Sequence, residues 1–216
     1  MQTPTRKGVA VTDPASHLRL WATVVAGVAL DLLSKYAAWA TLGGPPDEGG
    51  RQVVLLPGWL RLVAGRNTGI VFGIRLSEML ALGPAAGQAL TLALTAATVA
   101  LIFYVFAVSP RGSRWIPVWC GLILAGALGN LYDRLAFGYV RDLIQFTGRF
   151  RVAGLALEWP YVFNIADVYL SIGVIAVALA FLFGRQASAG LPSQGGGSSP
   201  PPRAPSKDSA HGRSGP

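Results

Sequence analysis

Charged residues and cysteine are both scarce in this chain. The first shortage argues against an ordinary soluble domain, and the second excludes sites that need two or more cysteines. Only 13% of the 216 residues are Asp, Glu, Lys or Arg, whereas about 25% is typical of soluble domains. Cys120 is the single cysteine, so neither an intrachain disulfide nor a cysteine metal site can form. The two histidines, His17 and His211, lie near the chain ends, which argues against a histidine-based site. With 52% hydrophobic residues and a mean hydropathy of +0.46, the chain is typical of an integral membrane protein.

The positive net charge does not indicate a nucleic-acid partner. The formal charge is +8, but the 18 Lys and Arg residues are scattered through flanks and loops. A basic stripe interleaved with aromatic residues, which nucleic-acid binding favours, is missing from the sequence. We therefore expect anionic membrane lipids as partners and no nucleic acid.

Four apolar segments are long enough to cross a membrane. About 20 helical residues, rising about 1.5 Å each, span a hydrocarbon core of about 30 Å. The segments lie at about residues 18–42, 79–108, 115–137 and 161–183. They predict an all-α integral membrane protein with four transmembrane helices and a membrane domain over residues 18–184.

The remaining residues divide into two flanks and one distinctive connection. Residues 1–17 are a polar N-terminal flank, and residues 185–216 are a Gly, Ser and Pro-rich tail; we expect both to be disordered. Residues 43–77 connect the first two spans. Apolar and polar residues alternate over residues 52–63 and break at Pro57 and Gly58, which predicts a small β-hairpin region.

The first span could instead be a cleaved signal peptide. Residues 38–40 (AWA) form an A-x-A-like cleavage site. However, Asp31 and Lys35 directly follow the apolar centre of the segment, which is wrong for such a peptide, and three further spans follow. We therefore treat residues 18–42 as a retained helix.

Polar residues inside the spans gather toward one side of the membrane. They are Asp31 and Lys35 late in span one, Asn130, Asp133 and Arg134 late in span three, and Asn164 and Asp167 early in span four. Because odd and even spans cross in opposite directions, all seven lie toward the face opposite both termini. Region 43–77 and Asp142 reach the same face. An ionisable group at bilayer depth costs roughly 2.5 to 3.5 kcal/mol, so this convergence predicts one shared functional site.

Charge alone does not decide which face this is. Nine of the 18 Lys and Arg residues fall on the side of the termini, and nine fall elsewhere. The positive-inside rule therefore gives no orientation.

The residue types at the shared site restrict its chemistry. Ser34 is adjacent to Lys35 on a helix and so points elsewhere, which leaves a Ser–Lys dyad poorly supported. Lys35 and Arg134 would repel a metal cation, so we expect neither a metal nor a cofactor. Carboxylates remain as the reactive groups.

A pair of close carboxyl groups is the arrangement that fits best. Two such groups cannot both ionise, and the shared proton lets one act as base on a water while the other acts as acid. Asp31 and Asp133 each have a neighbouring cation in sequence, so we expect them to be supports. Asp142 and Asp167 are the predicted pair.

Two other functions use the same residue types. In a small transporter or proton relay, intramembrane carboxylates would bind a cation or pass protons. A relay needs polar groups across the full membrane thickness, whereas these gather toward one face. In a structural subunit, the charged pairs would serve assembly, and single charge removals would destabilise a complex.

Five short stretches together resemble the lipoprotein signal peptidase family, signal peptidase II, over about residues 18–184. They are residues 31–35 (DLLSK), 67–72 (NTGIVF), 126–134 (GALGNLYDR), 138–142 (GYVRD) and 163–167 (FNIAD). Members of that family are bacterial intramembrane aspartic peptidases.

The resemblance implies a role for each matching residue. It makes Asp142 and Asp167 the catalytic dyad. It places Asn67, Asn130, Arg134 and Asn164 at the substrate, with Asp31, Lys35, Gly69, Phe72 and Asp133 in support. The implied substrate is a prolipoprotein whose cysteine carries diacylglycerol, cut just before that cysteine at the outer face of the bacterial cytoplasmic membrane. Both termini would then be cytoplasmic and the β-hairpin region of residues 43–77 extracytoplasmic, and we expect a monomer.

This chain departs from the family pattern beside the dyad. Arg141 and Leu143 flank Asp142 where apolar Val and Phe are usual, and Ile70 and Val71 replace small residues. The larger side chains could reshape the substrate groove. If its guanidinium turned inward, Arg141 would lower the pKa of Asp142.

Overall fold

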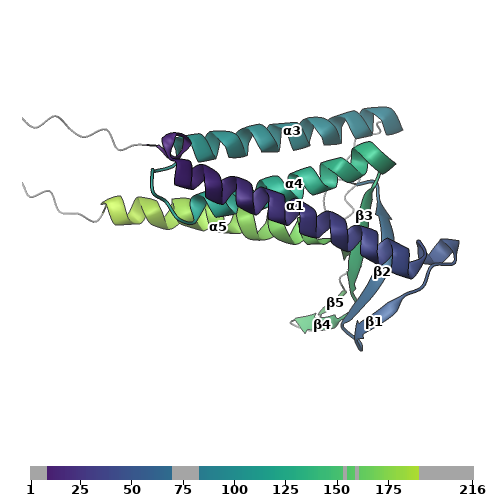
Figure 1. Ribbon diagram of the computed structural model, residues 1–216. Coiled ribbons are helices and arrows are strands. Elements are labelled where there is room, and N and C mark those ends of the chain that lie inside the picture. Colours follow the sequence, from purple (N-terminus) through teal and green to yellow (C-terminus); the bar gives the residue numbers. More distant parts are fainter. Residues whose placement is uncertain (1–8, 70–82, 153–154, 159–160, 190–216) are drawn as a thin grey trace, which may run out of the picture.

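Four long helices lie side by side, and a small β-sheet lies across one end of them (Figure 1). The computed structural model describes residues 9–69, 83–152, 155–158 and 161–189. The helices are α1 (Pro14–Leu42), α3 (Pro84–Val108), α4 (Ile116–Phe137) and α5 (Ile165–Ala189). Each is long and apolar enough to cross a membrane, which confirms the four predicted spans.

Helix α1 begins earlier than predicted because Asp13 caps it. Asp13 Oδ2 accepts hydrogen bonds from the backbone N of Ser16 at 3.2 Å and from Ser16 Oγ at 2.7 Å. Pro14 occupies the first helical turn, where its missing N–H has no cost. A short 3-10 turn, η1 (Ala10–Thr12), precedes the cap, so residues 9–17 are ordered and the expected disorder there is wrong.

Helix α5 differs from its predicted span at both ends. It begins at Ile165, later than predicted, because the preceding Val162–Phe163 form a strand, β6. It ends at Ala189, which extends it into the segment expected to be a disordered tail.

Helix α4 lies at the centre of the bundle, in contact with α1, α3 and α5, and is the most buried of the four. Glycines on the neighbouring helices make the close packing possible. A Cβ added at Gly27 of α1 would lie 2.7 Å from the Cβ of Ala125, and one added at Gly121 of α4 would lie 2.8 Å from the Cβ of Thr23. Small residues therefore let the helix backbones approach, as the Gly and Ala-rich sequence of α4 predicts.

The sheet contains strands from two separate parts of the chain. Strands β1 (Val53–Leu56) and β2 (Leu60–Asn67) form a hairpin within residues 43–77, the segment whose alternation predicts one. A short 3-10 turn, η2 (Pro46–Glu48), precedes them. Gly58 in the hairpin turn has φ 74°, a value that favours glycine.

Residues 138–160 connect the third and fourth predicted spans, and they and the first residues of the fourth span form four more strands in the described part of the chain. Strand β3 (Val140–Phe146) and β6 complete an antiparallel sheet in the order β1-β2-β3-β6. Strands β4 (Arg149–Val152) and β5 (Leu155–Glu158) make a separate hairpin. The predicted hairpin is therefore part of a larger sheet, and the strands after α4 were not predicted.

The pairing of β2 with β3 determines which of their side chains lie on the same face of the sheet. Gly65 pairs with Asp142, and Asn67 pairs with Val140. Alternate residues of a strand point to opposite faces, so Asn67 and Asp142 share one face of the sheet while Arg141 lies on the other. The polar ends of α1, α4 and α5 meet the sheet at this point.

Candidate active site

Asp142 and Asp167 are brought together by Asn164. The Asn164 Nδ2 donates to Asp142 Oδ1 at 2.7 Å, and the Asn164 backbone N donates to Asp167 Oδ2 at 3.2 Å. Asp142 is 2% exposed and Asp167 is 9% exposed, so both carboxyl groups are withdrawn from solvent. The structure thus brings together the two residues that the sequence predicts as a pair.

The start of α5 fixes the direction of Asp167. Asn164 Oδ1 accepts a hydrogen bond from the backbone N of Asp167 at 3.0 Å, which reciprocates the bond from Asn164 N to the Asp167 carboxylate. This reciprocal pair is a capping box, in which residues three apart satisfy each other's free N–H groups. The Asn-x-x-Asp spacing before an apolar run is its signal in the sequence. The helix start therefore holds one carboxylate oxygen and leaves the other available.

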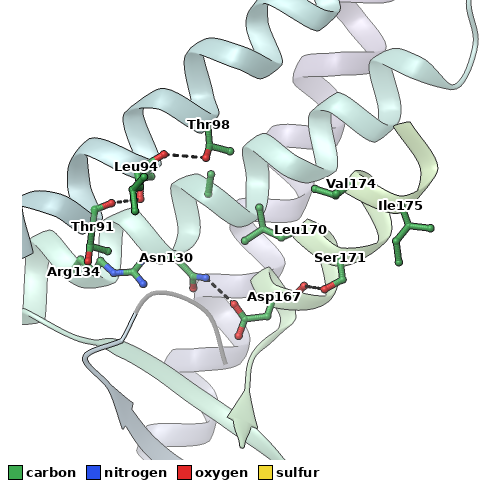
Figure 2. Close-up of a pocket in the computed structure, with 12 residues that line it drawn as sticks. Thr91, Leu94, Thr98, Asn130, Arg134, Asp167, Leu170, Ser171, Val174 and Ile175 are labelled. Atoms are coloured by element: carbon green, nitrogen blue, oxygen red, sulfur yellow. Dashed lines mark hydrogen bonds between the residues drawn. The ribbon is translucent and has the colours of Figure 1, made fainter. Parts of the chain in front are cut away.

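Asn130 holds that second oxygen. Its Nδ2 donates to Asp167 Oδ1 at 3.0 Å, as Figure 2 shows. Its Oδ1 accepts from Lys35 Nζ at 3.0 Å and from Asn164 Nδ2 at 3.2 Å. An ammonium group can only donate, so the amide oxygen of Asn130 must face Lys35 and its NH₂ must face Asp167.

Lys35 lies at the centre of a buried group of charges. Its Nζ is 2.7 Å from Asp31 Oδ2 and 3.2 Å from Asp133 Oδ2, and all three side chains are fully buried. Asp31 Oδ1 also accepts from the backbone N of Ala166 at 3.0 Å. The predicted pair of Asp31 and Lys35 is therefore formed, and it joins α1 to the first turn of α5.

Asp133 has different partners from those predicted. We expected the adjacent Arg134 as its cation, but Asp133 lies between Lys35 and Arg141. Arg141 Nη2 and Nε donate to Asp133 Oδ1 at 2.8 and 3.1 Å, and the backbone N of Arg141 donates to Oδ2 at 2.9 Å. The guanidinium thus faces α4 and the bundle, away from Asp142, because strand alternation separates neighbouring side chains. The idea that it turns toward Asp142 is wrong.

Residues 67–69 connect the sheet to α4 beside the two carboxyl groups. Asn67 Oδ1 accepts from the backbone N of Gly69 at 2.8 Å, which leaves its NH₂ to donate to Asp142. Arg134 Nη2 donates to the Gly69 carbonyl oxygen at 3.0 Å. Phe72, the remaining predicted support, lies outside the described residues.

Asp142 lies on β3, outside the membrane-spanning helices, and its pKa is well above the usual value of a carboxyl group. Burial raises its pKa, and the nearby negative charge of Asp167 raises it further, to about 7. Hydrogen bonds from Asn67 and Asn164, and the charge of Lys35, act in the opposite direction but do not offset the burial. Asp142 can therefore hold a proton near neutral pH.

An apolar cavity of about 440 Å³ opens between α3, α4 and α5 and ends at this polar group (Figure 2). Asn130, Arg134 and Asp167 form its polar part. The rest of its wall consists of Thr91, Leu94, Thr95, Thr98, Ala127, Leu170, Ser171, Val174 and Ile175. Asp167 belongs to its wall, so this apolar space borders the carboxyl pair and can hold an apolar ligand.

Sequence reasoning missed the contribution of α3 to this cavity. The sequence predicts no site residue in the second span, yet Thr91, Thr95 and Thr98 line the cavity wall. Each threonine hydroxyl donates to a carbonyl one turn earlier on its own helix, at 2.9 Å. The hydroxyls are therefore satisfied internally. The spacing of these threonines along one helix face is a signal that the sequence does contain.

From the sequence we expect no metal ion at the acidic residues of this site. Within the described parts of the chain, no group of three or more His, Cys, Asp or Glu residues is arranged to hold a metal ion. The carboxylates of the site instead pair with Lys35, Arg141 and amide groups.

Comparison with known proteins shows which family the chain belongs to. A family model described as signal peptidase (SPase) II matches residues 23–183. The chain belongs to this family. It is 34% identical to the lipoprotein signal peptidase of Chlorobaculum tepidum over 157 residues, 72% of this chain and 88% of the relative. It is 36% identical to the lipoprotein signal peptidase of Rhodopseudomonas palustris over 165 residues, 76% of this chain and 92% of the relative.

Two solved structures, each described as a bacterial membrane enzyme, are similar to this fold. One has a TM-score of 0.62 and 27% identity, with 83% of this chain and 94% of the other covered. The second has a TM-score of 0.57 and 28% identity, with 77% and 92% covered. The family and the four apolar helices together make the chain a multi-pass peptidase of the bacterial inner membrane.

Proposed function

We propose that the chain is an aspartic endopeptidase that removes signal peptides from diacylglyceryl-modified prolipoproteins, cutting just before the lipidated cysteine. Membership of the signal peptidase II family supports the substrate class. One observation supports the aspartic mechanism above all: Asn164 links two buried carboxyl groups, Asp142 and Asp167, at the polar end of an apolar cavity.

In the proposed reaction the two carboxyl groups share one proton. Asp142, whose pKa lies near 7, begins protonated, and Asp167 begins ionised. Asp167 accepts a proton from a water as the water oxygen attacks the scissile carbonyl carbon. Asp142 donates its proton to the carbonyl oxygen. Collapse of the intermediate returns a proton to the leaving amine, so neither a metal nor a cofactor takes part.

The cavity suggests how the substrate lies. Its apolar wall, formed by α3, α4 and α5, would hold the acyl chains and the apolar signal segment, while the scissile bond reaches the polar end. Asn67, Asn130, Arg134 and Asn164 would hold the substrate backbone, and Asp31, Lys35 and Asp133 would support them. We further propose that this polar end and the sheet face the outer side of the membrane, with both termini cytoplasmic and the enzyme a monomer.

The arrangement does not favour a transporter. A proton or ion relay needs polar groups at intervals across the membrane, and the buried charged groups of the described spans gather near the sheet.

Cleavage of a purified diacylglyceryl-modified prolipoprotein in detergent, with EDTA present, tests the proposal. Asp142→Asn and Asp167→Asn should each lower kcat by about 100- to 10,000-fold, the usual contribution of acid–base groups. Asp47→Asn, the same change at an exposed acid of η2, is the matched control and should keep wild-type activity. Substantial turnover by both dyad variants would refute the dyad. A folded wild-type enzyme that cuts no such substrate would refute the function.

A further inference from the structure

Arg141 is a buried cation that the proposed mechanism does not use. It is 3% exposed, and its guanidinium lies 4.2 Å from the ring centre of Tyr36 and 4.5 Å from that of Phe137. Contacts with both rings, together with the two side-chain hydrogen bonds to Asp133, hold the group in one place. Desolvating a guanidinium is costly, so this arrangement calls for a role.

We propose that Arg141 is a positioning residue for catalysis, acting on Asp167 through Asp133, Lys35 and Asn130. This inference rests on the proposed function, because it assigns Arg141 a part in the reaction of that same site. The contacts run without a break through buried groups. They pass from Arg141 of β3 to Asp133 of α4 and Lys35 of α1. From Lys35 they return to Asn130 of α4 and reach Asp167 of α5.

The first step of that chain is the saturation of Asp133. Its Oδ1 accepts both guanidinium bonds, and its Oδ2 accepts a hydrogen bond from the backbone N of Arg141 and forms an ion pair with the ammonium of Lys35. Two anions, Asp31 and Asp133, are thus balanced by two cations in a region closed to water. Removing Arg141 would leave one buried negative charge uncompensated.

The second step concerns the partners of Lys35. Its Nζ donates hydrogen bonds to Asp31 Oδ2 at 2.7 Å and to the neutral Asn130 Oδ1 at 3.0 Å, and it forms an ion pair with Asp133 Oδ2 at 3.2 Å. Hydrogen bonds between ionised partners are stronger than those to neutral ones. An uncompensated Asp133 would therefore attract Lys35 away from Asn130.

The last step is the effect on Asp167. Lys35 fixes the amide oxygen of Asn130, and that orientation points the Asn130 NH₂ at Asp167 Oδ1. When the Lys35 bond is lost, only Asn164 Nδ2, at 3.2 Å, still holds the amide oxygen of Asn130. The Asn130 amide is then less firmly oriented, and its hydrogen bond to Asp167 Oδ1 is weakened. A displacement of about 1 Å in a catalytic group can cost about 100-fold in rate.

The test compares Arg141→Leu with the wild type in the prolipoprotein assay. Leucine keeps the backbone N–H that donates to Asp133, so β3 retains that attachment to α4. We expect kcat to fall by about 10- to 100-fold while KM stays within about twofold, because Arg141 is not part of the cavity wall. Arg61→Leu removes an arginine of the same sheet, one that donates to Gln52 of the adjacent segment, and should leave both constants unchanged.

Two further variants separate positioning from a purely structural role. Arg141→Lys restores the charge and should recover part of kcat. Combining Arg141→Leu with Asp133→Asn restores electrical balance: the introduced amide oxygen can keep the two contacts that Asp133 Oδ2 makes, and the introduced NH₂ takes the place of Oδ1. This double variant should turn over about tenfold faster than Arg141→Leu alone.

Either of two outcomes would overturn the inference. One is an Arg141→Leu enzyme with wild-type kcat. The other is a double variant no faster than Arg141→Leu, with kcat in all variants following only the fraction folded in thermal melts. If Arg141→Leu does not fold, Arg141→Lys is compared with the wild type instead: a lower kcat with an unchanged melting temperature supports the inference, and a wild-type kcat overturns it. Wild-type enzyme without activity would instead count against the proposed function.

Discussion

Asp142 combines a buried position, a negatively charged neighbour and a pKa near 7 in one side chain. If it must be protonated to donate to the carbonyl oxygen, kcat should decline as pH rises through about 7, since a raised pKa means that the proton is lost in this range. Measurement of kcat from about pH 5 to about pH 9 with saturating substrate checks this.

The control for that profile is the thermal melting temperature at each pH, which separates loss of protonation from unfolding. A kcat that rises across pH 7 would contradict the assignment, because it would mean that Asp142 acts as the ionised base.

At the residue scale, local spacing predicted some contacts and missed others. Asp31 and Lys35 are four apart on a helix, so their ion pair follows from helix geometry alone. Asp133 and Arg141 are separated by a helix end, a turn at Gly138 with φ 80°, and the start of a strand. Their contact depends on the path of that turn, which no helical periodicity contains.

At the element scale, the close contact between α1 and α4 is the feature most open to test. Gly27 is buried against Ala125, whereas its neighbour Ala26 is exposed on the outer surface of the same helix. Gly27→Leu should destabilise the fold by about 1–3 kcal/mol through overpacking, and Ala26→Leu should have little effect. Thermal melting of both variants in the same detergent makes the comparison.

Because α1 carries Lys35 and Asp31, activity should fall along with stability in Gly27→Leu. Equal melting temperatures for the two leucine variants would show that the helices can separate at this point without cost.

The strands after α4 mark the limit of what sequence patterns predict. The four spans are long apolar runs, which are strong signals. Strand β3 instead buries Val140, Arg141, Asp142 and Leu143 in succession, so apolar and polar residues do not alternate. Its charged residues are buried because partners on other elements neutralise or hydrogen-bond them. Strand β6 has only two residues. Such strands are defined by tertiary contacts.

At the scale of the whole molecule, the buried ion pairs of Lys35 and Arg141 and the sheet lie at one end of the bundle, while α1 begins and α5 ends at the other (Figure 1). This polarity was predicted from the alternating directions of the spans. The side of the membrane was predicted only from the family resemblance, because nine of the 18 cationic residues lie on the side of the termini and nine elsewhere. Orientation is therefore the whole-molecule property that most needs a measurement.

Single-cysteine labelling provides that measurement. Cys120 is fully buried and can be replaced by alanine, which gives a cysteine-free background. Asp47→Cys lies in η2 beside the sheet, and Arg111→Cys lies in the loop between α3 and α4 at the opposite end. Both positions are exposed, so a membrane-impermeant maleimide discriminates them by side alone. In intact spheroplasts we expect Asp47→Cys to react and Arg111→Cys to react only after permeabilisation. The reverse pattern would place the carboxyl pair toward the cytoplasm. An outer-face cleavage could not then occur, even if the purified enzyme cuts its substrate in detergent.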